Sequence, residues 1–112
     1  MITFPCAKIN LGLNIVNKRS DGYHELQTVF YPTKLTDTLE IKRMYDDFPV
    51  DTACDLKIYG IPVACNEQDN LVVKAYNLIA QDYDLPRIHA HLFKQIPSQA
   101  GLGGGSSDAA YM

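Results

Sequence analysis

Hydrophobic and polar residues alternate along the first part of the chain. From residue 7 to residue 15 apolar side chains occupy every second position, with polar residues or glycine between them. A period of two is typical of a β-strand, so this segment is predicted to form one. The same period places Lys8 and Asn10 side by side on the polar face, where both can reach one ligand. The other face is predicted to carry Ala7, Ile9, Leu11, Leu13 and Ile15.

Similar patterns predict four more strands and one helix. The strands are expected at residues 25–31, 38–42, 55–59 and 87–96, with a polar turn at 17–22. Strands 38–42 and 55–59 are predicted to pair with each other, joined by a loop whose residues 46–49 are solvated. Asn70 can cap a helix whose apolar positions 71, 72, 75, 78 and 79 recur at helical spacing. This order of elements predicts an α+β fold with a mixed sheet and packed helices.

A dense run of glycine and serine follows the last predicted strand. Residues 97–108 read Pro-Ser-Gln-Ala-Gly-Leu-Gly-Gly-Gly-Ser-Ser-Asp, and two alanines come next. Glycines let backbone N–H groups approach an anion, and a helix beginning near Ser106 and Ser107 would add the positive end of its dipole. The run is therefore predicted to bind nucleotide phosphates, although either serine could instead cap the helix.

Two common phosphate-binding loops do not match this run. A Walker A loop needs a lysine after its last glycine, and no lysine is nearer than Lys94. A dinucleotide fingerprint needs a third glycine where Ser106 stands. A flexible glycine-serine linker is the remaining alternative, but the embedded Leu102 favours a folded turn.

Charge and composition exclude other classes of function. The net charge is −3, and the ten Lys and Arg residues are scattered, so no basic surface for nucleic acid is expected. No apolar segment approaches the roughly 20 residues of a membrane span, and we expect a cytoplasmic protein. Cys6, Cys54 and Cys65 lack metal spacing and are expected to be reduced, partly buried thiols. His89 and His91 face the same way without a nearby third ligand, which makes a zinc site improbable.

The segment from Pro97 to Ala110 resembles the phosphate loop of the GHMP kinases, a family of small-molecule kinases. Pro-Cys-Ala-Lys-Ile-Asn-Leu at 5–11 and Arg-Ser-Asp-Gly-Tyr-His-Glu-Leu-Gln-Thr at 19–28 resemble one branch of it. That branch phosphorylates a cytidine-diphosphate-linked methylerythritol in the non-mevalonate isoprenoid pathway. Gln99 departs from the small residue usual at its position. The resemblance implies that residues 1–112 are the N-terminal part of the ATP-binding domain, truncated after the glycine loop, with a C-terminal domain absent.

The resemblance also implies roles for individual residues. Lys8 would lie by the acceptor hydroxyl, near an aspartate from a later segment, and would stabilise charge on the transferred phosphoryl group. Tyr23 would stack on the cytosine and His24 would hydrogen-bond its edge. Asn10 is a candidate for the polar end of the substrate, and Asp108 is expected to cap a helix rather than to act in catalysis. The expected ATP-binding residues are Pro97, Ser98, Gln99, Ala100, Gly101, Leu102, Gly103, Gly104, Gly105, Ser106 and Ser107.

These expectations amount to an ATP- and Mg²⁺-dependent kinase, with the ion held mainly by phosphate oxygens and water. The 112-residue chain is expected to be inactive by itself and to self-associate through exposed apolar surface. Two alternatives stay open: a GHMP kinase with a different alcohol acceptor, and a non-catalytic nucleotide-binding fragment.

Overall fold

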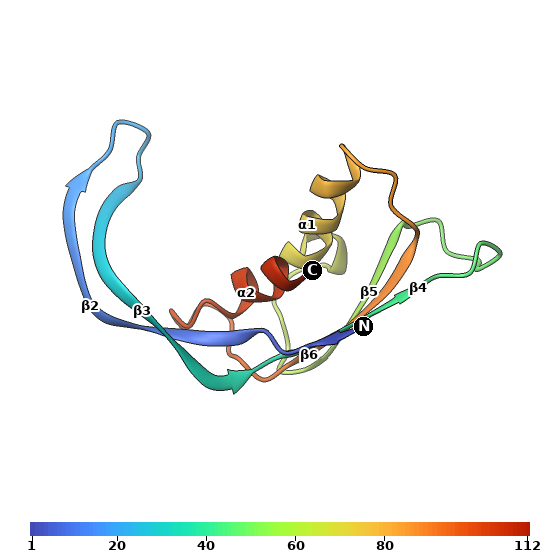
Figure 1. Cartoon of the computed structure of the whole chain (residues 1–112), viewed down its shortest axis with the longest axis horizontal. Coiled ribbons are helices and arrows are strands. Elements are labelled where there is room, and N and C mark those ends of the chain that lie inside the picture. Colours follow the sequence, from blue (N-terminus) through green and yellow to red (C-terminus); the bar gives the residue numbers. More distant parts are fainter.

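A computed structural model describes residues 1–112. The chain forms a four-stranded sheet with two helices on one face, and a two-stranded arm curves away from this body (Figure 1). In chain order the elements are β1 (Ile2–Thr3), β2 (Cys6–Lys18), β3 (His24–Thr36), β4 (Thr38–Arg43), β5 (Cys54–Gly60), the 3₁₀ helix η1 (Glu67–Asp69), α1 (Leu71–Ala80), β6 (Ile88–Lys94) and α2 (Gly104–Tyr111). The predicted α+β class is confirmed. Neither helix has the length and apolar character needed to cross a membrane.

Strand β6 lies in the interior of the sheet. The order is β1-β4-β6-β5, with β6 antiparallel to β4 and parallel to β5. The prediction that segments 38–42 and 55–59 pair with each other is therefore wrong. The connection over residues 44–53 is long enough to span the roughly 10 Å between strands two positions apart, so β6 can enter between them. The sheet is mixed because β5 returns to β6 through α1.

Helix α1 covers the sheet and closes the core. Its predicted cap is confirmed: the Asn70 side chain accepts a hydrogen bond from the Val72 amide at 2.9 Å. Of the apolar positions that predicted the helix, Val72 is buried but Leu71, Leu78 and Ile79 are exposed, and the buried face is completed by Val73 and Tyr76. Apolar residues occupy most of the helix circumference, so periodicity could not select one face. The core cluster consists of Leu39, Cys54, Leu56, Val72, Val73, Tyr76, Ile88, Ala90 and Leu92.

The arm is a hairpin of β2 and β3, and both strands are longer than predicted. The pairing shifts at Gly12, since Leu11 faces Val29 across the hairpin whereas Leu13 faces Thr28. Gly12 is the extra residue and has φ of +71°. Because Thr28 and Val29 point to opposite faces, so do Leu11 and Leu13. The prediction of a single apolar face through residue 15 is therefore wrong beyond Gly12.

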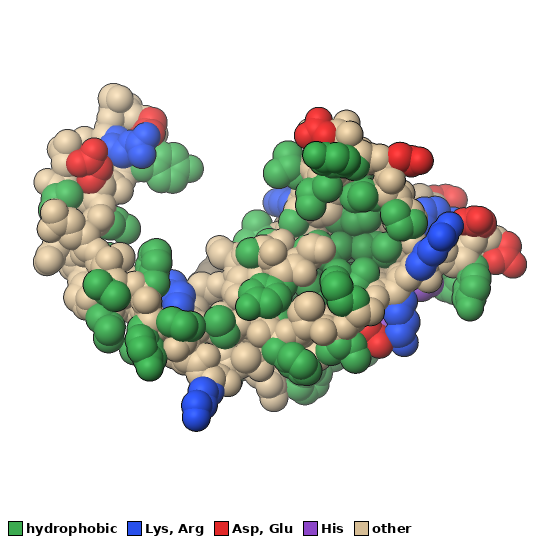
Figure 2. Space-filling model, in the orientation of Figure 1, with side chains coloured by type: hydrophobic (Ala, Val, Ile, Leu, Met, Phe, Trp, Pro, Cys, Tyr) green, Lys and Arg blue, Asp and Glu red, His purple; other side chains and the backbone are tan.

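Apolar side chains of the arm remain exposed. Figure 2 shows hydrophobic side chains along the arm, which is separated from the helices by a wide hollow. Leu11, Leu13 and Ile15 are all more than half exposed. The core cluster contains no residue of the arm, so burial stabilises the body much more than the arm.

The cap of α1 gives a direct test of this fold. Asn70→Ala should lower the free energy of unfolding by about 1 kcal/mol, because the Val72 amide loses its acceptor. The matched control is Asn66→Ala, since Asn66 precedes η1 without making a side-chain cap bond. Urea denaturation measures both variants, and equal losses would contradict the capping role.

Candidate active site

The glycine loop between β6 and α2 is attached to the first residues of the arm. The Lys8 amide donates to the Leu102 carbonyl at 2.9 Å, and Lys8 Nζ donates to the Gly101 carbonyl at 2.8 Å. A flexible linker would not be held by such contacts, so the predicted folded turn is confirmed. The loop is thereby fixed between the arm and the helical face of the body.

Unusual backbone angles shape this loop. Gln99, Gly101 and Gly103 have φ of +57°, +73° and +68°, in the left-handed region that glycine adopts without strain. Gly103 is the N-cap of α2, which begins at Gly104, two residues before the predicted start. Neither serine caps the helix, because the cap makes no side-chain hydrogen bond. The amides of the first helical turn have no partner within the helix and can bind an anion.

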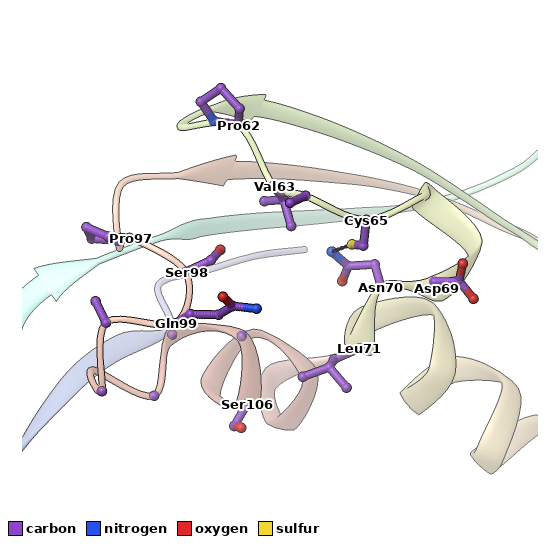
Figure 3. Close-up of a pocket in the computed structure, with 16 residues that line it drawn as sticks. Pro62, Val63, Cys65, Asp69, Asn70, Leu71, Pro97, Ser98, Gln99 and Ser106 are labelled. Carbon is purple, nitrogen blue, oxygen red and sulfur yellow. Dashed lines mark hydrogen bonds between the residues drawn. The ribbon is translucent and has the colours of Figure 1, made fainter.

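A pocket of about 620 Å³ lies between the loop and the start of α1 (Figure 3). Its volume falls within the range of small-ligand sites. All the predicted ATP-binding residues line it except Leu102 and Ser107. In Figure 3 the Gln99 side chain extends toward Asn70, which hydrogen-bonds Cys65. Sequence reasoning missed the opposite wall, whose residues are Pro62, Val63, Ala64, Cys65, Asp69, Asn70 and Leu71.

Lys8 and Asn10 lie together beside the loop, as the strand period predicted. Lys8 Nζ donates to Asn10 Oδ1 at 3.1 Å and lies 5.2 Å from the centre of the Phe30 ring. A Cβ on Gly103 would come within 3.0 Å of Lys8 Cε, so the lysine stem lies directly against the loop. A half-buried ammonium in this place can donate to an oxygen of a phosphoryl group bound at the loop.

Tyr23 and His24 lie at the far end of the arm. His24 pairs with Lys18, and the Tyr23 amide donates to Asp21 Oδ1 at 3.1 Å in the tip turn. The Tyr23 side chain is 74% exposed. Eight residue-to-residue steps along β2 lead from Asn10 to Lys18, a path of at most roughly 26 Å. The structure thus brings Lys8, Asn10 and the glycine loop together, and leaves Tyr23 and His24 at the tip of the arm, which curves away from the body (Figure 1).

Comparison with known proteins shows that this chain is similar to small-molecule kinases. The model for the GHMP kinases N terminal domain matches residues 70–112, which include the loop and both helices. In a crystal structure of 4-(cytidine 5'-diphospho)-2C-methyl-D-erythritol kinase, 99% of this chain superimposes with a TM-score of 0.73 at 36% identity. The whole chain is thus similar in fold to that kinase, and residues 70–112 are similar in sequence to the N-terminal domain of the GHMP kinases. That match covers 37% of the solved chain.

Two curated relatives extend the likeness over the whole chain. A 4-diphosphocytidyl-2-C-methyl-D-erythritol kinase of Bacteroides thetaiotaomicron is 57% identical over 112 residues, and the enzyme of that name from Porphyromonas gingivalis is 52% identical over 113. Both alignments cover all of this chain. The chain spans only 40% and 39% of the lengths of these relatives.

A buried ion cluster of Asp37, Lys94 and Asp108 lies beneath the loop. Lys94 Nζ donates to Asp37 and, at 2.9 Å, to Asp108 Oδ2. The expectation that Asp108 caps a helix is therefore wrong, because Asp108 lies beyond the first turn of α2 and faces the sheet. Burial raises the pKa of Asp108 to about 6. Burial disfavours the charge of Lys94, but hydrogen bonds to both carboxylates outweigh it and raise the pKa of Lys94.

The sequence did contain a signal for this cluster. Lys94 continues the inward alternation of Ile88, Ala90 and Leu92 along β6. A lysine at an inward position requires buried carboxylates, because an isolated buried charge is strongly unfavourable. The pattern could have identified Lys94 as a buried residue, but it could not identify which carboxylates approach it.

The two histidines of β6 lie on the sheet face away from the helices. His89 Nδ1 is 3.1 Å from Asp55 Oδ2, and His91 Nδ1 is 3.0 Å from Glu40 Oε2. The hydrogen bond from His91 lowers the pKa of Glu40. All three cysteines are free; Cys54 is buried and Cys65 is exposed at the pocket. Burial raises the pKa of Cys54 to about 11, so that thiol stays protonated.

Close packing at the start of α2 can be tested with two neighbouring glycines. A Cβ on Gly104 would lie 2.7 Å from Ile96 Cγ2, whereas a Cβ on Gly105 meets nothing nearer than Leu71 Cδ1 at 3.6 Å. Gly104→Ala should therefore lower the free energy of unfolding by about 1–3 kcal/mol through overpacking. Gly105→Ala should be neutral or stabilising by up to about 1 kcal/mol, since alanine favours helix. Urea denaturation compares them, and a fully stable Gly104→Ala variant would contradict the described packing.

Proposed function

We propose that this chain is the N-terminal part of an ATP-dependent kinase that phosphorylates a hydroxyl of 4-diphosphocytidyl-2-C-methyl-D-erythritol in the non-mevalonate isoprenoid pathway. The observation that carries the proposal is the direct attachment of Lys8 to the glycine loop. It supports a role in phosphoryl transfer, because an ammonium group beside a loop that binds phosphate would stabilise the charge on the transferred group. The names of relatives at 52% and 57% identity support the choice of acceptor.

On the ATP side, the loop amides and the first turn of α2 bind the phosphates in this proposal. The pocket beside them has the size to take the nucleoside, with the wall after β5 opposite the loop. Magnesium would accompany the phosphates and neutralise their charge, and the hydroxyls of Ser106 and Ser107 are the proposed protein contacts. The ion is proposed to be held mainly by phosphate oxygens and water.

On the acceptor side, Lys8 orients the phosphoryl group and stabilises the charge that develops on its oxygens. Asn10 fixes the ammonium through its Oδ1 atom and offers its amide N–H₂ group to the substrate. Tyr23 and His24 are proposed to bind the cytosine at the tip of the arm. An extended substrate with a diphosphate between its two ends suits two sites that lie this far apart.

The remainder of the relatives' length is proposed to supply a C-terminal domain and the aspartate that accepts or orients the hydroxyl proton. Activity is therefore measured on a polypeptide of the relatives' full length, with ADP release coupled to a colour reaction. Release that requires the cytidine substrate supports the proposal. Release with another alcohol would favour the broader kinase class, and absence of ATP binding would favour a non-catalytic role.

Replacing Lys8 tests the chemical step. Lys8→Met should lower kcat by about 10²–10³-fold, with only modest changes in either KM, because the lost donor acts mainly on the transition state. The backbone bond from Lys8 to Leu102 survives the substitution and keeps the loop attached. Lys74→Met, on the exposed face of α1, is the control and should retain wild-type rates. A rise in the KM for ATP with unchanged kcat would show a ground-state role instead.

Replacing Tyr23 tests the acceptor. Tyr23→Ala should weaken binding of the cytidine substrate by about 1–3 kcal/mol, the value of one base stacked on an aromatic ring. Binding of an ATP analogue should not change, because the loop is a separate site. Tyr45→Ala is the matched control, since Tyr45 is equally exposed but lies beyond β4. Calorimetry with the cytidine compound and its uridine analogue measures this, and equal affinity of the wild type for both would refute base recognition.

A further inference from the structure

The buried ion cluster holds three separate segments together. Asp37 lies between β3 and β4, Lys94 ends β6, and Asp108 lies in α2. Their side chains are almost completely buried, with exposures of 0%, 3% and 1%. One ammonium group thus joins two carboxylates that are 71 residues apart in the sequence, and both hydrogen bonds are buried.

Each carboxylate fixes one end of the glycine loop. Asp37 Oδ1 accepts hydrogen bonds from the amides of Gln95 at 2.5 Å and Ile96 at 2.8 Å, immediately before the loop begins. Asp108 holds α2, immediately after the loop ends. Lys94 connects both carboxylates, so the chain enters and leaves the loop around the same ion.

The first residue of α2 lies directly against this cluster. A Cβ on Gly104 would be 3.3 Å from Lys94 Nζ, and the same atom would overlap Ile96. The helix therefore approaches the end of β6 as closely as its backbone allows. The ion cluster sets the distance between α2 and the end of β6. That distance determines where the unpaired amides at the N-terminus of α2 lie.

Stability alone does not account for three buried charges. Burying ions costs desolvation energy, and a buried ion pair is often no more stable than apolar residues of similar volume. Asp108 Oδ1 adds to this cost because it has no hydrogen-bond partner. A cluster that contributes little to stability but fixes the distance between two segments is suited to specifying geometry.

We propose that Asp37, Lys94 and Asp108 are positioning residues, whose buried ion cluster holds the two ends of the glycine loop at the separation needed to bind phosphate. The inference rests on the proposed function, because it assumes that the loop binds ATP. The three residues contact no substrate. They act through the backbone of residues 95–104.

The two carboxylates should differ in their response to a neutral replacement. Asn at position 37 keeps an oxygen for the Gln95 and Ile96 amides but turns an N–H₂ group toward the Lys94 ammonium, so donors oppose each other. Asn at position 108 can turn its oxygen to Lys94 and place its N–H₂ group where Oδ1 now lacks a partner. Asp37→Asn should thus disturb the loop more than Asp108→Asn.

The experiment uses a polypeptide of the relatives' full length. Calorimetry measures Kd for a non-hydrolysable ATP analogue and for the cytidine substrate, and hydrogen exchange follows a peptide covering residues 97–107. Asp37→Asn should raise the Kd of the ATP analogue at least about tenfold and speed exchange in the loop, while the Kd for the cytidine substrate stays within about twofold. Asp108→Asn should change the first Kd by less than about threefold.

Two further variants separate positioning from stability. Leu56→Ala opens the core opposite Ala90 and lowers stability without touching the cluster. It should leave the Kd of the ATP analogue unchanged. The triple variant Asp37→Asn, Lys94→Met, Asp108→Leu removes every charge and should fold, yet it should show the faster loop exchange and the weaker ATP binding.

Wild-type ATP affinity and loop exchange in a folded triple variant would overturn the proposal. So would a loss of ATP affinity in Leu56→Ala that matches the loss in Asp37→Asn at equal stability. If the wild type does not bind the ATP analogue, the proposed function fails, but hydrogen exchange in the loop still tests the positioning role. Faster loop exchange in the triple variant than in Leu56→Ala supports the positioning role, and equal exchange refutes it.

Discussion

A lysine ammonium is buried at the end of the central strand, and such a charge is stable only when carboxylates surround it. That requirement brings Asp37 and Asp108 to one point, although they belong to distant parts of the chain. The segment before β4, the exit of β6 and helix α2 are therefore fixed relative to one another. The glycine loop joins two of these three segments, and its shape depends on the charge below it.

A second set of contacts joins the arm to this fixed region. Main-chain and side-chain bonds from Lys8 to the loop connect β2 with the end of the pocket. The same lysine contacts Asn10 and the Phe30 ring, so its ammonium is held from the arm as well as from the loop. The residue proposed to act on the phosphoryl group is thus placed where the two parts of the molecule meet.

Sequence reasoning predicted the local elements well because each has its own signal. The Asn70 cap, the alternation before Gly12 and the glycine loop are all determined by neighbouring residues. The predicted strand pairing was wrong because pairing depends on which strand takes the interior position of the sheet, and the sequences of segments 38–42 and 55–59 do not indicate that another strand lies between them. The face change at Gly12 was missed because one inserted residue reverses every later side chain. Asp108 was misassigned for a related reason: its partner lies on another element.

The body and the arm differ in how strongly their geometry is fixed. Core burial and the ion cluster hold the glycine loop, whereas the outer arm is a two-stranded hairpin with exposed apolar side chains. Such a hairpin is only marginally stable by itself, so local opening is expected to cost less free energy at its tip than at the loop. A ligand that contacts Tyr23 and His24 must order these residues when it binds, while phosphates meet a loop that is already formed. In the proposed kinase, the chemical step would therefore depend on the rigid part of the molecule, and selection of the acceptor would depend on the hairpin tip that ligand binding orders.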